Sequence, residues 1–116
     1  MTSNGSIGRG VATWSGEPLE GTVREVTTPA DVLDLMSEMP ADVIVLMHTA
    51  GATTLSPLFG DISGIVCTTG SEGSHVAILS RDFGIPCIVG ASLEDPNLNG
   101  SRIRMEPTGE IFRQDG

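Results

Sequence analysis

The chain has 116 residues, enough for one domain with a single core, and 39% of them are hydrophobic. Its net charge of −9 argues against nucleic acid and anionic membranes as partners, since both require clustered Lys and Arg. The sequence lacks a signal-peptide pattern and the roughly 18-residue apolar run of a membrane helix, so we expect a cytoplasmic protein. Cys67 and Cys87 lie in apolar runs, which favours small buried hydrophobic residues over a disulfide. We expect one domain over residues 1–116, frayed at residues 1–6.

The first part of the chain is rich in glycine. Residues 7–12 and 21–26 flank a turn that contains Gly and Pro, and we expect both segments to form strands of a glycine-rich N-terminal layer.

A helix is predicted to begin after Thr28, a good N-cap residue, with Pro29 in its first position and Asp31 in its first turn. Pro40 ends it. The expected apolar face consists of Val32, Leu33, Leu35, Met36 and Met39.

The nearly continuous apolar run at residues 42–47 is typical of a strand that is covered on both faces. His48 and Thr49 follow it at the carboxyl end, where open α/β sheets bind ligands. His48 is therefore a candidate site residue, although an ordinary strand-end histidine is the commoner interpretation. Ser56 and Pro57 then predict the start of a short helix.

The stretch that follows predicts a strand, a loop and a helix. Residues 64–67 form an apolar run that leads into a small polar loop. Ser74 is a good N-cap residue, whose oxygen can accept a bond from a helix N–H. Gly84 stands where a left-handed cap belongs, and Pro86 prevents continuation. His75 is thus expected in the first turn of the helix. The apolar residues of this helix are Val76, Ala77, Ile78, Leu79 and Phe83.

Beyond this helix, residues 87–89 predict a buried strand and residues 91–99 a turn-rich connection. Residues 100–105 alternate between polar and apolar, as a half-buried strand does, and residues 110–112 predict a short final strand.

The position of His75 has chemical meaning. The first N–H groups of a helix have no partner within it and carry partial positive charge, and small loop residues let backbone N–H groups approach an anion. A neutral imidazole there is a nucleophile, and N–H groups near Gly73, Ser74 and His75 would hold a phosphoryl group attached to it. A capping or merely exposed histidine is the alternative interpretation of these residues alone.

The stretch also resembles the phosphohistidine motif of the mobile, or swivelling, domain of phosphoenolpyruvate (PEP)-utilising enzymes, a family that includes pyruvate phosphate dikinase, PEP synthase and rifampicin phosphotransferase. The matching residues are Gly70, Ser74, His75, Ala77, Ile78, Arg81, Gly84, Ile85, Pro86, Val89 and Gly90. Two positions depart from the family pattern. Ser71 replaces the second glycine of a pair, and Gly73 replaces a Thr.

The resemblance implies an α/β fold, the swivelling β/β/α domain, with a central mostly parallel sheet, flanking helices and the glycine-rich N-terminal β layer. It implies that His75 is the phosphorylated residue. The phosphoryl-binding residues that it implies are Gly70, Ser71, Gly73, Ser74 and Thr49. For Arg81, two roles stay open: a charge that contacts a docking partner, and a structural salt bridge.

The resemblance also implies a function. We expect a phosphohistidine carrier that shuttles a phosphoryl group between a separate ATP-grasp nucleotide-binding subunit and an acceptor site, as one component of a PEP synthase- or dikinase-like phosphotransferase. We expect no cofactor or metal on this chain, because ATP and Mg²⁺ would bind the partner; a further subunit can hold the acceptor. The alternative is a non-catalytic docking or regulatory module that keeps the fold and the anion pocket. Pyruvate, a phenol, another alcohol and water all stay open as acceptors.

Overall fold

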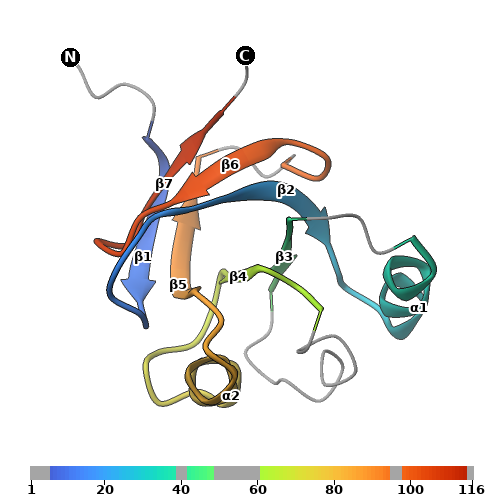
Figure 1. Ribbon diagram of the computed structural model, residues 1–116, viewed down its shortest axis with the longest axis horizontal. Coiled ribbons are helices and arrows are strands. Elements are labelled where there is room, and N and C mark those ends of the chain that lie inside the picture. Colours follow the sequence, from blue (N-terminus) through green and yellow to red (C-terminus); the bar gives the residue numbers. More distant parts are fainter. Residues whose placement is uncertain (1–5, 39–41, 49–60, 95–97, 115–116) are drawn as a thin grey trace.

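The computed structural model describes residues 6–38, 42–48, 61–94 and 98–114. Their strands close into one barrel in the order β1-β5-β4-β3-β2-β6-β7, with two helices outside it (Figure 1). The strands are β1 (Ser6–Ala12), β2 (Leu19–Glu25), β3 (Val43–Met47), β4 (Gly64–Cys67), β5 (Cys87–Leu93), β6 (Arg102–Met105) and β7 (Glu110–Arg113). The helices are α1 (Pro29–Glu38) and α2 (His75–Phe83). Neither is long and apolar enough to span a membrane.

The expected α/β fold with flanking helices and a separate N-terminal β layer is wrong, because the described strands form one closed, mixed barrel. Strands β2, β3, β4 and β5 run parallel, whereas β1 and β6 pair antiparallel with β5 and β2. Strand β7 then joins β1 to β6. The glycine-rich N-terminal strands therefore continue the sheet instead of stacking on it. Closure leaves no row of unpaired backbone groups at a sheet edge.

Strand β2 shows how the two halves of the barrel merge. Its residues 19–22 pair antiparallel with β6, and its residues 22–25 pair parallel with β3, so the partner changes at Thr22. A strand that serves both halves cannot belong to a separate layer.

Strand β3 is buried at every position, which confirms the prediction of a strand covered on both faces. Val43, Val45 and Met47 belong to a core cluster that includes Val32 and Leu35 of α1 and also contains α2 residues. Ile44 and Leu46 belong to a second cluster inside the barrel. The alternation of strand side chains therefore divides the core between the outside and the inside of the barrel.

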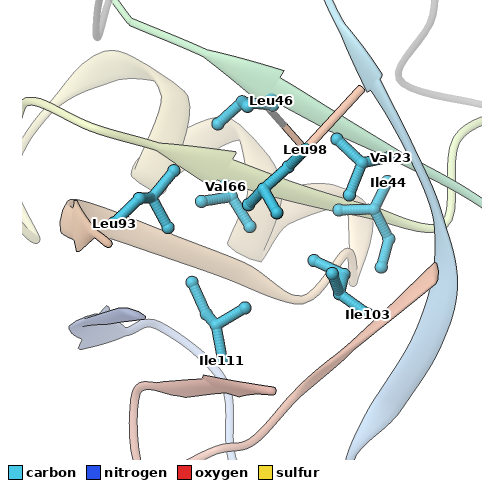
Figure 2. A pocket seen from close by; sticks show the side chains of 8 residues that line it. All are labelled: Val23, Ile44, Leu46, Val66, Leu93, Leu98, Ile103 and Ile111. Atoms are coloured by element: carbon cyan, nitrogen blue, oxygen red, sulfur yellow. The ribbon is translucent and has the colours of Figure 1, made fainter. Parts of the chain in front are cut away.

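The interior of the barrel is filled by aliphatic side chains from many strands (Figure 2). They leave no space for a water molecule at the centre. The central side chains are Val23, Ile44, Leu46, Val66, Leu93, Leu98, Ile103 and Ile111. The barrel is thus a packed core and offers no ligand cavity there.

Glycine is required where the barrel closes on itself. Gly109 has φ 98°, a left-handed conformation, and its carbonyl accepts a 2.9 Å hydrogen bond from the Gly10 N–H. A Cβ atom at Gly109 would collide with the Gly10 carbonyl oxygen. The β6–β7 turn can therefore lie against β1 only because this residue has no side chain.

Helix α1 begins as expected. The Thr28 hydroxyl accepts the Asp31 N–H at 3.3 Å, while the Asp31 carboxylate accepts the N–H groups of Thr27 and Thr28. Its predicted apolar face is only partly correct, because Leu33 and Met36 are 64% and 48% exposed. Met39 and Pro40 lie outside the described residues, and so do Ser56 and Pro57. Of residues 1–6, which we expected to be frayed, only Ser6 is described, and it belongs to β1.

Helix α2 and the strand after it differ from the prediction in their details. Gly84 adopts the left-handed cap conformation with φ 71°, as expected. Ile78 and Phe83, by contrast, are 42% and 56% exposed. The turn-rich connection expected at residues 91–99 is also wrong in part, because β5 continues to Leu93 to pair with β1.

Candidate functional site

The carboxyl ends of β2, β3 and β4 lie along one rim of the barrel. The loop that leads to α2 starts at the end of β4 (Figure 1). Met47 pairs with Cys67 in the last register position of β3 and β4. Just beyond it, the Thr68 N–H donates to the Met47 carbonyl at 3.0 Å. The rim therefore brings together the residues that follow β3 and β4.

The loop is held at its start by β5. The Gly90 N–H donates to the Thr69 carbonyl at 3.0 Å. A Cβ atom at Gly90 would lie 3.1 Å from the Gly70 carbonyl oxygen, and Gly90 and Gly70 both have positive φ, 61° and 93°. Glycine at these two positions lets the loop cross β5 at close range.

Ser74 is the N-cap residue of α2, but its side chain does not cap the helix in the expected way. Its hydroxyl donates to the Ser71 carbonyl at 2.6 Å and accepts no hydrogen bond from a helix N–H. The Ser74 N–H donates to the same carbonyl at 3.0 Å. Ser71 and Ser74 thus close a tight turn, and the Ser74 side chain leaves the first N–H groups of α2 available to an anion.

His75 is the first residue of α2 and is exposed. Within the described part of the chain, its ring has no hydrogen bond. The imidazole therefore stands beside the N-terminus of the helix and is open to a reactant.

Arg81 is in the last turn of α2 and reaches back to the loop. Its guanidinium donates to the Glu72 carbonyl at 2.9 Å. This contact is not a salt bridge, because the acceptor is a backbone carbonyl, and the docking role of Arg81 stays a prediction. Arg81 fixes the loop against the helix that carries His75.

Gly73 is exposed and has an ordinary φ, and a Cβ atom there would meet no other atom within 4 Å. Ser71 is exposed in the same loop. Of the predicted phosphoryl-binding residues, the structure places Gly70, Ser71, Gly73 and Ser74 in the loop before His75. Thr49 lies outside the described residues.

His48 lies on the same rim and makes contacts that the sequence did not predict. Its Nε2 is 2.7 Å from Glu25 Oε2, and its Nδ1 is 2.9 Å from the Thr68 hydroxyl. Glu25 and Thr68 were missed as site residues. One signal was available: both stand at or just after the ends of strands, and the ends of parallel strands meet at one edge.

One of the two cysteines contacts the rim, where Cys67 Sγ is 3.7 Å from the Thr69 hydroxyl. Cys67 and Cys87 are buried and not in a disulfide, as predicted. Burial raises the pKa of the Cys87 thiol to about 11, so it stays protonated at neutral pH and is a poor nucleophile. Among the described residues, His, Cys, Asp and Glu form no group of three that could hold a metal ion.

The chain is similar in sequence to several known proteins. Residues 39–106 match the family described as PEP-utilising enzyme, mobile domain. Chondramide synthase of Chondromyces crocatus is 32% identical over 90 residues, which are 78% of this chain and 2% of that protein. Rifampicin phosphotransferase of Bacillus subtilis is 33% identical over 98 residues, 81% of this chain and 11% of that protein. A protein of the phosphoenolpyruvate-dependent phosphotransferase system of Salmonella typhimurium is 38% identical over 56 residues, which are 47% of this chain and 8% of that protein. The chain therefore spans only a small part of these relatives.

Proposed function

Because the chain belongs to the family of mobile domains of PEP-utilising enzymes, we propose that it is a phosphohistidine carrier that accepts a phosphoryl group on His75 and passes it to an acceptor. The family resemblance inferred from the residues around His75 is confirmed. The carrier role goes further than the family itself and rests on the geometry of the loop.

One observation supports the proposal most strongly. An exposed imidazole stands at the first position of α2, directly after a loop whose small residues leave backbone N–H groups free of side-chain caps. The partial positive charge of a helix N-terminus favours bound phosphoryl oxygens, and N–H groups there donate hydrogen bonds to them. His48, the other histidine of the chain, has both ring nitrogens within hydrogen-bond distance of neighbours.

In the proposed step, a nitrogen of the neutral His75 imidazole attacks the phosphorus atom of the donor. The N–P bond forms while the P–O bond to the donor breaks, and the leaving oxygen departs with the electron pair. In the second step, an acceptor oxygen attacks the phosphorus atom, loses its proton, and releases the imidazole. The loop N–H groups hold the three peripheral oxygens in both steps.

The donor in this proposal is ATP bound with Mg²⁺ on a separate ATP-grasp-type subunit, and the acceptor site lies on that assembly. The chain would then be one component of a phosphotransferase. The phosphotransferase part of this proposal is supported by two relatives of the chain, rifampicin phosphotransferase and a protein of the phosphoenolpyruvate-dependent phosphotransferase system.

We would test the proposal first with phosphoramidate, a small donor that phosphorylates histidine without a partner protein. We expect acid-labile phosphorylation of His75 and none of His48, located by mass spectrometry of peptides. The rate should exceed that of N-acetylhistidine by about tenfold or more, because the loop N–H groups stabilise the transferring group. The His75→Asn variant should remain unlabelled.

A second arm uses labelled ATP and the ATP-grasp subunit that co-purifies with the tagged chain. Wild type should take up acid-labile label, and His75→Asn should not. Equal labelling of the two proteins would refute His75 as the carrier. If the subunit binds the chain but His75 reacts with neither donor, the chain is a docking or regulatory module instead.

A further inference from the structure

The rim holds a second feature, which the carrier role does not explain. The His48 imidazole lies between Glu25 at the end of β2 and Thr68 just after β4, at 2.7 Å and 2.9 Å. Three neighbouring parallel strands are thus linked through one ring. The Glu25 backbone is itself held, because its N–H donates to the Asn99 side-chain oxygen at 2.9 Å.

The proton positions in this network follow from its partners. A carboxylate can only accept, so Nε2 of His48 carries a proton and donates it to Glu25. In the neutral imidazole, Nδ1 then has a free lone pair and accepts the Thr68 hydroxyl proton. Glu25 consequently selects the tautomer, and the two contacts together set the orientation of the ring.

The network continues directly into the loop that carries His75. Besides the ring contact to Thr68, the His48 carbonyl accepts a hydrogen bond from the Thr69 hydroxyl at 3.1 Å. His48 therefore holds two consecutive residues, and Gly70 is the next residue along the chain. Thr69 is also the residue whose carbonyl accepts the Gly90 N–H.

Side-chain packing contributes little to holding the loop that carries His75. Residues 69–73 are all exposed, and the side chains of His48 and Glu25 are 41% and 33% exposed. Hydrogen bonds rather than burial must therefore set the direction in which the loop leaves β4. Hydrogen bonds between side chains with this exposure contribute little to overall stability, because water competes for the same groups, so their effect should be local.

We propose that His48 is a positioning residue for phosphoryl transfer: with Glu25 and Thr68 it fixes the base of the loop, so that the loop N–H groups and His75 meet the incoming phosphoryl group in the correct geometry. The inference rests on the carrier function proposed for His75. A displacement of about 1 Å in a reacting group is enough to reduce a rate by roughly a hundredfold.

The experiment compares initial rates of His75 labelling by phosphoramidate at one donor concentration. His48→Phe keeps a flat ring but removes both ring contacts, and Thr68→Val removes one hydroxyl. We expect both variants to react about tenfold more slowly than wild type. Thr68→Ser restores the hydroxyl and should react at close to the wild-type rate. Thr108→Val serves as the control, because it removes a hydroxyl that contacts Glu110 in the distant β6–β7 turn.

Two further measurements separate positioning from a general loss of structure. The imidazole ¹⁵N shifts of His48 should show the Nε2–H tautomer in wild type, and the Nδ1 shift should change in Thr68→Val. Amide hydrogen exchange should become faster at residues 69–75 in Thr68→Val, while the exchange rates in α1 and the midpoint of thermal unfolding stay unchanged.

The outcomes distinguish this inference from the function on which it rests. No labelling of wild-type His75 by either phosphoramidate or the ATP-grasp subunit with ATP would refute the carrier function. Normal labelling of wild type together with unchanged rates in His48→Phe and Thr68→Val would refute the positioning role alone. Equal losses in Thr68→Ser and Thr68→Val would also refute it, because the hydroxyl would not be responsible. If His48→Phe fails to fold, the pair of Thr68 variants decides.

Discussion

At the scale of single residues, Gly73 and Gly90 show how differently two glycines in one site can be constrained. Gly73 has an ordinary φ and open space where a side chain would stand. Gly90 has φ 61° and the Gly70 carbonyl oxygen 3.1 Å from the place of its Cβ atom. Only the second position needs glycine for its conformation, so the loop is not built around the absence of a side chain at residue 73.

We therefore predict that Gly73→Thr keeps or raises the rate of His75 labelling by phosphoramidate. A hydroxyl that donates to a charged oxygen contributes about 1.5–3 kcal/mol, which corresponds to a gain of about tenfold or more if the bond forms in the transition state. Gly90→Ala is the matched comparison and should label more slowly, because its methyl group strains the loop crossing. Abolished labelling in a folded Gly73→Thr variant would show that the phosphoryl group needs the space next to residue 73.

At the scale of elements, the start of α1 depends on one carboxylate. The Asp31 side chain accepts hydrogen bonds from the N–H groups of Thr27 and Thr28 and from the Thr27 hydroxyl. These bonds, the Thr27 backbone contact above all, lower the pKa of Asp31 below its usual value. The residues just before the helix are thus tied to its first turn by an ionised group.

This arrangement predicts an acid-dependent contribution to stability. A carboxyl whose pKa is lowered on folding stabilises the folded state above its unfolded pKa, and the contribution disappears as the pH falls through the folded pKa. Asp31→Ala should therefore be less stable than wild type at pH 7, and the difference should shrink in acid below about pH 4. Urea unfolding at several pH values measures it.

Asp34→Ala is the control, because it removes the same charge from the same helix without these hydrogen bonds. If Asp34→Ala reproduced the loss and its pH dependence, the effect would belong to the helix charge and not to the capping contacts of Asp31.

The sequence predicted elements well wherever local chemistry decides them. The bounds of α2 follow from Ser74 and Gly84, and both occupy the expected cap positions. The exposed Leu33 and Met36 could not be anticipated, because a helical apolar pattern does not say how wide a stripe the neighbouring strands will cover. The contact of Arg81 with the Glu72 carbonyl could not be predicted either, because every residue carries a backbone carbonyl and the sequence does not show which one a side chain will reach.

At the scale of the whole molecule, the sequence indicated the parallel strands but not the closed barrel. The continuous apolar run of β3 predicts burial on both faces, and this holds in the structure. Closure depends on pairings between segments far apart in the chain, such as β1 with β7. Periodicity is local and cannot reveal such pairings. The loop before His75 is continuous in the sequence, so its residues could be proposed from the sequence alone. Glu25 and Thr68, by contrast, meet His48 only through the strand order.

Barrel closure can be tested at Gly109, with Gly100 as its matched control. Both have positive φ, 98° and 89°, so alanine at either position should lose about 1–2 kcal/mol through its left-handed conformation. A Cβ atom at Gly100 would meet nothing within 4 Å, whereas one at Gly109 would collide with the Gly10 carbonyl. Gly109→Ala must therefore move the β6–β7 turn away from β1, at a further cost of about 1–3 kcal/mol or more. Guanidinium unfolding of both variants measures the difference. Equal losses would mean that the contact between Gly10 and Gly109 is not needed to close the barrel.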